Sequence, residues 1–239
     1  WLADQELGLV VDVAGNGENV FPEGPGSDNL NKLEYFEDRI AGLEKAIDAD
    51  LVSNGKPAHA SVFEQGKWQN YTAENSATLV GIPGFTDVVY NQQNSLLYFS
   101  TFGRGIFSFT TSSKEFKSLE QDGESPFVTK KITSLASNET GALWATEYDS
   151  PDKLFTLTDG QWSGMSLPSG NHPLEVLPIP YETTWLRLEN GLLVVDPETG
   201  ASTMLSLNNK NLISSTVTAM ALDRDGFIWY GTPSGVAYI

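Results

Sequence analysis

The chain has 239 residues, with 31 Asp and Glu against 14 Lys and Arg, so its formal net charge is −17. Nucleic acids and anionic lipid surfaces are bound through clustered Lys and Arg, so this balance argues against both as partners. The absence of Cys excludes disulfides, thiolate metal ligands and cysteine nucleophiles.

Hydrophobic residues make up 40% of the chain, which is enough to build a sizeable core. No apolar run reaches the roughly 18 residues that a membrane-spanning helix needs, so we expect no direct insertion into a membrane. The first sixty residues carry 12 acids and 4 bases, but the apolar pairs among them indicate a folded segment rather than a tail.

The N-terminal part of the chain contains a segment with two interpretations, 31–50. Taken alone, it has the 3, 4, 3, 4 spacing of an amphipathic helix, at Leu33, Phe36, Ile40, Leu43 and Ile47. The repeat described below requires two strands instead, around Leu30–Phe36 and Arg39–Glu44. We follow the repeat because the other units obey it, and we expect a peripheral acidic insertion at 45–58.

Strand–turn–strand units with Gly- or Asn-rich turns follow one another along the chain. They are WLADQELGLVVDV at Trp1, Val62 to Thr72, Ser95 to Phe109, Ile132 to Tyr148, Leu154 to Ser166, Thr183 to Gly200, and Val217 to Ile239. Each combines alternating apolar residues with turn residues, a pattern typical of short antiparallel strands.

Aromatic residues mark the period of these units. Tyr98, Trp144, Trp185 and Trp229 are separated by 46, 41 and 44 residues. A repeat of about 40–45 residues with four strands is typical of β-propeller blades. We therefore predict an all-β fold with four-stranded antiparallel blades. Six blade units are marked, as a single propeller domain over 1–239 or as part of a seven-bladed ring.

The six Trp residues fall at two positions of the repeat. Trp1, Trp144, Trp185 and Trp229 are expected on second strands, and Trp68 and Trp162 on fourth strands. Aromatic side chains at fixed blade positions are expected to fill the wedges between neighbouring sheets rather than to hold a ligand.

The C-terminal unit resembles a known repeat. LDRDGFIWYGTPSGVAYI matches the two-component regulator propeller pattern at Asp223, Gly226, Trp229, Gly231, Thr232 and Gly235. The match is weaker at Leu143–Thr146 and Trp185–Leu188. The stretch NNKNLISSTVTAM, Asn208 to Met220, is similar to the linker that enters each new blade in such proteins.

Two kinds of Bacteroidota protein carry these repeats, and the chain resembles the PorZ-like surface components of the type IX secretion system more than periplasmic sensors. Degenerate blades and YFSTFGRGIFSF, around Ser100–Gly103 and Gly105–Phe107, carry that resemblance. It implies a non-catalytic role at the cell surface or in the periplasm, in attachment of cargo to anionic lipopolysaccharide. Starting in mid-blade, the chain is expected to be excised from a longer protein.

The residues themselves give little support to an enzyme. A metal-dependent propeller lyase needs several inward-facing His or acidic residues on first strands. The first strands here offer Asp87 and Glu175 but no His, whereas His59 and His172 lie beside prolines in apparent loops. We therefore predict no catalytic residues, no cofactor and no metal site, and a propeller lyase or hydrolase stays the least favoured alternative.

Several residues have both a structural and a ligand-binding interpretation. Asp223–Gly226 opens like a calcium loop but lacks the closing Glu, so a hairpin turn is favoured. The acid pairs Asp48/Asp50 and Asp149/Asp152 are treated in the same way. Arg104, between two glycines, and the adjacent pair Lys130 and Lys131 are the bases best suited to an anion.

The function predicted from the sequence is a binding or scaffold module. Its partners would be other secretion-system proteins or anionic lipopolysaccharide or glycan, and open blade edges would allow a dimer. The alternative is the ligand-sensing propeller of a hybrid two-component regulator. The binding residues are not identified by the sequence.

Overall fold

The computed structural model consists of strands and turns, with one 3-10 helix, η1 (Ala77–Leu79), among the residues it describes. Side chains are described for residues 24–48, 51–119, 125–168, 170, 172–179, 182–208 and 212–239, and the backbone alone for 2–4, 8–11 and 18–20. No helix within these ranges is long and apolar enough to cross a membrane.

Five antiparallel sheets form the blades of a propeller, numbered here in chain order. Blade 1 contains β4 (Lys32–Phe36), β5 (Arg39–Leu43), β6 (Ala60–Glu64) and β7 (Lys67–Tyr71). Blade 2 contains β8 (Phe85–Asn91), β9 (Leu96–Thr101), β10 (Ile106–Thr110) and β11 (Glu115–Ser118). Blade 3 contains β12 (Ile132–Ser137), β13 (Leu143–Glu147), β14 (Asp152–Thr158) and β15 (Gln161–Ser166).

Blade 4 contains β16 (Pro173–Pro178), β17 (Thr184–Leu188), β18 (Gly191–Val195) and β19 (Ser202–Leu205). Blade 5 has three strands, β20 (Ala219–Leu222), β21 (Ile228–Thr232) and β22 (Gly235–Tyr238). The all-β propeller fold with four-stranded antiparallel blades, predicted from the aromatic period, is confirmed.

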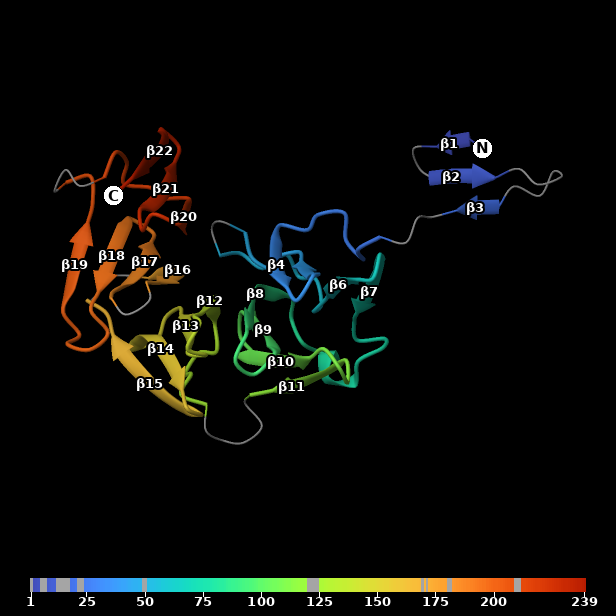
Figure 1. The fold of residues 1–239 in the computed structure, drawn as a ribbon, viewed down its shortest axis with the longest axis horizontal. Helices are drawn as coiled ribbons and strands as arrows, with labels where there is room; N and C mark the ends of the chain where they lie inside the picture. Colours follow the sequence, from blue (N-terminus) through green and yellow to red (C-terminus); the bar gives the residue numbers. More distant parts are fainter. Residues whose placement is uncertain are drawn as a thin grey trace.

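The predicted number of blades, six in the chain or seven in a ring, is wrong, because the propeller has five. The N-terminal strands β1 (Leu2–Asp4), β2 (Gly8–Val11) and β3 (Glu18–Val20) pair in an antiparallel sheet of their own. Figure 1 shows this sheet apart from the five blades. Alternation and turn residues predict strands within one sheet, whereas a blade also has to pack against a neighbour, and the period does not encode that packing. Trp1 lies outside the described residues.

The blades follow one another in an arc, with the first strand of each toward the centre and the last strand outside (Figure 1). The inner strands β4, β8, β12, β16 and β20 lie side by side in that order. No comparable contact joins β20 back to β4 in the described part of the chain. Apolar clusters fill the wedges between successive blades, so the core lies between sheets.

The segment 31–50, for which a helix was the alternative, forms strands as far as Leu43. β4 and β5 are joined by the two-residue turn Glu37-Asp38, and both turn residues have positive φ, 44° and 60°. Such a turn matches the twist of the two strands that it joins. Leu33 and Tyr35 are exposed while Phe36 is buried, as expected for alternation along a strand rather than for a helical stripe.

In blades 2, 3 and 4, the aromatic residue at the second-strand position packs against the next blade. Tyr98 of blade 2 packs in the cluster of blade 3, Trp144 in the cluster of blade 4, and Trp185 against the cluster of blade 5. Trp144 is 8% exposed, whereas Trp229, at the same position of blade 5, is 40% exposed. The predicted structural role of these aromatics is thus seen wherever a following blade is present.

Candidate functional site

The candidate site lies at the end of the blades where each first strand begins and each second strand ends. Three of the first strands share a β-bulge there, after Phe85, Ile132 and Pro173. In two of them the residue within the bulge is a threonine, Thr86 or Thr133. Bulges re-aim side chains locally, and here they turn these two hydroxyls toward the neighbouring blade.

The threonine hydroxyls connect neighbouring blades. Thr86 Oγ1 donates to the Ile132 carbonyl at 2.7 Å, and Thr133 Oγ1 donates to the Pro173 carbonyl at 2.8 Å. Each threonine also contacts a hydroxyl of the adjacent second strand, that of Ser100 or Thr146, at 2.8 and 2.9 Å. These bonds satisfy backbone carbonyls at the inner ends of the blades.

Blade 4 departs from this arrangement. Leu174 stands in its bulge and carries no hydroxyl. Arg187, on the second strand, instead directs Nη1 toward the Val217 carbonyl at 3.4 Å and donates from Nε to Glu175 at 2.8 Å. A guanidinium is thereby brought to the centre of the propeller, where the preceding two blades have hydroxyl pairs.

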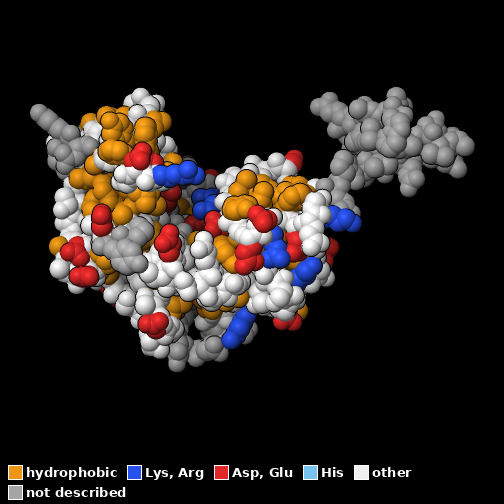
Figure 2. Space-filling view, viewed as in Figure 1, with side chains coloured by type: hydrophobic (Ala, Val, Ile, Leu, Met, Phe, Trp, Pro, Cys, Tyr) orange, Lys and Arg blue, Asp and Glu red, His pale blue; other side chains and the backbone are white. Residues whose placement is uncertain are grey.

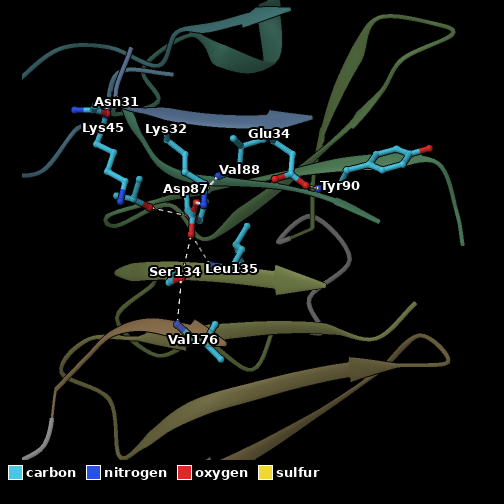
Figure 3. Close-up of polar contacts among 12 residues, drawn as sticks. Asn31, Lys32, Glu34, Lys45, Asp87, Val88, Tyr90, Ser134, Leu135 and Val176 are labelled. Atoms are coloured by element: carbon cyan, nitrogen blue, oxygen red, sulfur yellow. Dashed lines mark hydrogen bonds and ion pairs between the residues drawn. The ribbon is translucent and has the colours of Figure 1, made fainter. Parts of the chain in front are cut away.

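A buried carboxylate, Asp87, connects the inner strands of blades 1, 2 and 3 (Figure 3). It is 3% exposed and pairs with Lys32 Nζ at 2.8 Å. It also accepts hydrogen bonds from the Ser134 hydroxyl at 3.0 Å and from the Leu135 N–H at 2.9 Å. Ser134 Oγ in turn accepts from the Val176 N–H of blade 4 at 3.4 Å.

Burial and charge act on the two ionisable residues of β4. Burial lowers the pKa of the Lys32 ammonium, but the charge of Asp87 and its hydrogen bond outweigh burial, so the net effect is a raised pKa. For Glu34, burial is the largest effect and raises the pKa, although the Tyr90 N–H donates to it at 2.9 Å. The polar groups of the inner strands therefore serve mainly to hold blades together.

A central cavity of about 660 Å³ opens beside this network. Its lining comes from blades 2, 3 and 4 and from the connections that adjoin blades 1 and 5: Asn31, Lys45, Ile47, Asp48, Leu51, Thr86, Thr133, Leu174, Arg187, Leu188, Glu189, Thr216, Val217 and Thr218. We call it the axial cavity. Figure 2 shows Lys and Arg side chains in the hollow between the C-terminal blade and blade 1, with apolar side chains on both rims.

The predicted insertion at 45–58 contributes directly to the axial cavity. Lys45, Ile47, Asp48 and Leu51 line it, while Asp50 lies outside the described residues. Lys45 is held by its backbone, since its N–H donates to Asn31 Oδ1 at 2.8 Å and its carbonyl accepts from Asn54.

A second cavity, of about 590 Å³, lies on blade 1 and contains His59. The His59 ring nitrogen Nε2 is 3.3 Å from the buried Ser61 hydroxyl, which donates to Asn70 Oδ1 at 2.7 Å. The Gly26 N–H also donates to Asn70. These contacts hold the segment around Gly26 against β6 and β7, and Ser61 is fully buried.

His172, Asp149 and Asp152 are held by structural contacts in the described part of the chain. The His172 ring packs against Tyr148 in a tilted arrangement with ring centroids 4.6 Å apart, and its Nδ1 is 3.7 Å from Asp149. Asp152 accepts a hydrogen bond from Ser166. No group of three or more potential metal ligands occurs in the described part of the chain.

Asp223–Gly226 is a turn. Asp223 Oδ1 accepts the N–H groups of Asp225 and Phe227, both at 2.9 Å, and Oδ2 accepts Trp229 Nε1 at 2.6 Å. These hydrogen bonds, the Trp229 bond first, lower the pKa of Asp223. Its carboxylate is thus occupied by the hairpin itself.

The bases highlighted by the sequence lie close together. Arg104 and Lys130 line one cavity at the same end of the propeller, and Lys131 pairs with Asp149 at 3.3 Å. The sequence did not reveal the axial lining. One available signal was the threonine that follows the first apolar residue in FTDVVY, ITSLAS and VTAMAL, namely Thr86, Thr133 and Thr218.

Comparison with known proteins bears on the fold. Residues 211–234 match the family described as two component regulator propeller. Comparison with curated proteins gives no match. Among solved structures, the extracellular domain of BT4673 from B. thetaiotaomicron matches with a TM-score of 0.69 and 14% identity over 92% of this chain. The chain spans 28% of that structure's length. This chain is a β-propeller.

Two other similar structures have different reported functions. Virginiamycin B lyase from Staphylococcus aureus has a TM-score of 0.61 and 14% identity, over 90% of this chain and 71% of that chain. PorZ of Porphyromonas gingivalis has 13% identity over 97% of this chain and 50% of that chain. Its TM-score of 0.46 is too low to support a structural argument. At these identities the likenesses show a shared fold and leave function to the site.

Proposed function

We propose that the chain is a non-enzymatic binding module of the cell surface or periplasm, and that the axial cavity is its ligand site. The observation that carries this proposal is the convergence on that cavity of residues from blades 2, 3 and 4 and from the connections that adjoin blades 1 and 5. A concave site with a few convergent polar groups, built on rigid strands, is the usual form of a small-ligand site.

The lining favours binding over catalysis. Two ion pairs beside the cavity are structural, Glu175 with Arg187 and Asp87 with Lys32. A lyase or hydrolase needs a general base within reach of a substrate proton. Neither His59 nor His172 lines the axial cavity.

The ligand best suited to the axial cavity is a saccharide. Its lining combines hydroxyl, amide and guanidinium groups, on Thr133, Asn31 and Arg187, with apolar Leu51 and Val217. Sugars present hydroxyls and C–H faces together, so both kinds of lining would be used. Because Lys45 and Arg187 are countered by Asp48 and Glu189, we favour a neutral part of a glycan here, as on a cell-surface lipopolysaccharide.

A sensory role is the second candidate. The family match at 211–234 is to a repeat named for two-component regulators, and it supports a propeller whose ligand controls a regulator. In that case the same axial cavity would bind a glycan fragment, and the partner would be a signalling domain rather than a secretion component.

Titration calorimetry on the 239-residue chain tests the proposal, with purified anionic lipopolysaccharide and with neutral glucan and mannan oligosaccharides as probes. We expect one of them to bind, and Lys45→Ala to weaken that binding about tenfold. Lys114→Ala, on an exposed turn of blade 2, is the matched control. Absence of binding to every probe, or equal binding by both variants, would overturn the assignment of the axial cavity.

A further inference from the structure

A separate cavity on blade 2 is lined by two basic side chains. It has a volume of about 380 Å³ and is lined by Ala77, Thr78, Ile82, Arg104, Phe107, Ser118 and Lys130. None of these residues is acidic, in a chain with a net charge of −17. Among the described residues, this lining therefore carries positive charge in a chain whose net charge is negative.

The backbone that presents Arg104 is fixed on both sides. Gly103 and Gly105 have φ of 127° and 70°, values that favour glycine, and both of their N–H groups donate to the Lys130 carbonyl, at 2.7 and 3.2 Å. Thr101 Oγ1 accepts the Arg104 N–H at 3.0 Å and donates to the Gly105 carbonyl at 2.9 Å. The hairpin tip is preorganised by these bonds.

The backbone of Lys130 is fixed by a buried carboxylate. Glu147 is fully buried and accepts the N–H groups of Thr129 and Lys130, at 2.5 and 2.6 Å. Because the Lys130 carbonyl also receives the two glycine N–H groups, its main chain is held from both directions. Arg104 and Lys130 thus approach the cavity from two segments joined by main-chain hydrogen bonds.

The Arg104 guanidinium stays available for a ligand. Arg104 is exposed, and its side chain forms no hydrogen bond or ion pair in the described part of the structure. The Thr78 hydroxyl donates to the Phe116 carbonyl at 3.0 Å, which leaves its oxygen at the cavity as an acceptor. Ile82 and Phe107 supply an apolar wall.

We propose that this cavity binds the phosphate or carboxylate group of a sugar derivative, with Arg104 and Lys130 as the anion-binding residues. A guanidinium takes such an oxyanion through two parallel hydrogen bonds, and an ammonium adds a point charge. The apolar wall and the Thr78 hydroxyl would face the sugar. This site is distinct from the axial cavity and does not depend on the function proposed for it.

The experiment is a titration of the 239-residue chain, followed by calorimetry, with glucose 6-phosphate, glucuronate, inorganic phosphate and glucose. We expect the charged sugars to bind at least tenfold more tightly than glucose, and binding to weaken as salt rises. Tighter binding of glucose 6-phosphate than of inorganic phosphate would assign the sugar a contact. Equal binding would reduce the proposal to a phosphate site.

Arg104→Gln is the decisive variant, since the Arg104 side chain makes no hydrogen bond or ion pair with the described residues and thermal unfolding should be unchanged. It should weaken binding of the charged sugars at least tenfold. Arg224→Gln, at the Asp223–Gly226 turn, removes the same charge elsewhere and should leave binding unchanged. Failure of every charged probe to bind, or equal loss in both variants, would overturn the site. Lys45→Ala, which tests the axial cavity, should leave the difference in affinity between the charged sugars and glucose unchanged.

Discussion

Arg187 occupies in blade 4 the position that Thr146 occupies in blade 3. Each stands opposite the third residue of its first strand, Glu175 or Ser134, in the same register. The threonine completes a hydroxyl pair that reaches the next blade, whereas the arginine reaches the Val217 carbonyl itself. At the junction of blades 4 and 5, the single charged side chain of Arg187 thus takes the place that the neutral pair Thr133 and Thr146 has at the junction of blades 3 and 4.

We expect Arg187→Met to destabilise the fold by about 1–3 kcal/mol, because it leaves the Glu175 carboxylate and the Val217 carbonyl without their partner. Urea unfolding followed by fluorescence measures this change. The triple variant Leu174→Thr, Glu175→Ser, Arg187→Thr copies the arrangement of blade 3 and should recover most of the loss. Unfolding midpoints that are equal for Arg187→Met and the wild type would contradict the bridging role.

Removal of the buried carboxylate of blade 2 should be costly. Asp87→Ala strands the Lys32 ammonium and the Leu135 N–H, and we expect a loss of about 3–5 kcal/mol in the free energy of unfolding. Asp87→Asn keeps an acceptor for the N–H and should lose less. Denaturant unfolding of both variants separates the two effects. Equal losses would mean that the charge of Asp87 accounts for the whole loss and that a neutral acceptor at this position contributes nothing.

Glu34 gives a pH dependence of known sign. Its pKa is raised in the folded state, so the folded chain binds the proton more tightly than the unfolded chain does. Its contribution to stability therefore falls as pH rises from the unfolded pKa through the folded one. Glu34→Gln keeps an acceptor for the Tyr90 N–H without the charge. The stability of this variant relative to the wild type should increase between pH 4.5 and pH 8.

Unfolding by urea at several pH values measures that difference, in which the other titrating groups cancel to first order. A stability difference that is flat over this range, or that falls with rising pH, would contradict the raised pKa of Glu34.

The two tryptophans at the second-strand position should differ in their contribution to stability. Trp144→Ala removes a buried plug between blades 3 and 4 and should cost about 3–5 kcal/mol. Trp229→Ala removes a side chain that is 40% exposed and should cost less than half as much. Thermal or urea unfolding of the two variants compares them directly. Similar losses would show that Trp229 is covered in solution.

The strands could be predicted from the sequence because each blade repeats a local pattern. Trp144, Trp185 and Trp229 stand on second strands, and Trp68 and Trp162 on fourth strands, as the spacing of the aromatics indicated.

The site could be predicted only in part, because its contacts are made between blades. Asp87 was recognised as an inner-strand acid, but its partner Lys32 comes from the preceding blade and follows no motif. Arg104 and Lys130 were noted separately. They are brought together by hydrogen bonds to the Lys130 carbonyl, and main-chain bonds of this kind leave no trace in residue type.

The aromatic residues of the second strands make the contacts between blades asymmetric. In blades 2, 3 and 4, this aromatic side chain packs against the blade that follows and not against the preceding one. Trp229 is the uncovered member of that series, beside Tyr238 with ring centroids 5.1 Å apart. A further sheet that packed against Trp229 would make the same kind of aromatic contact that joins blades 2 to 5, and those blades would keep their packing.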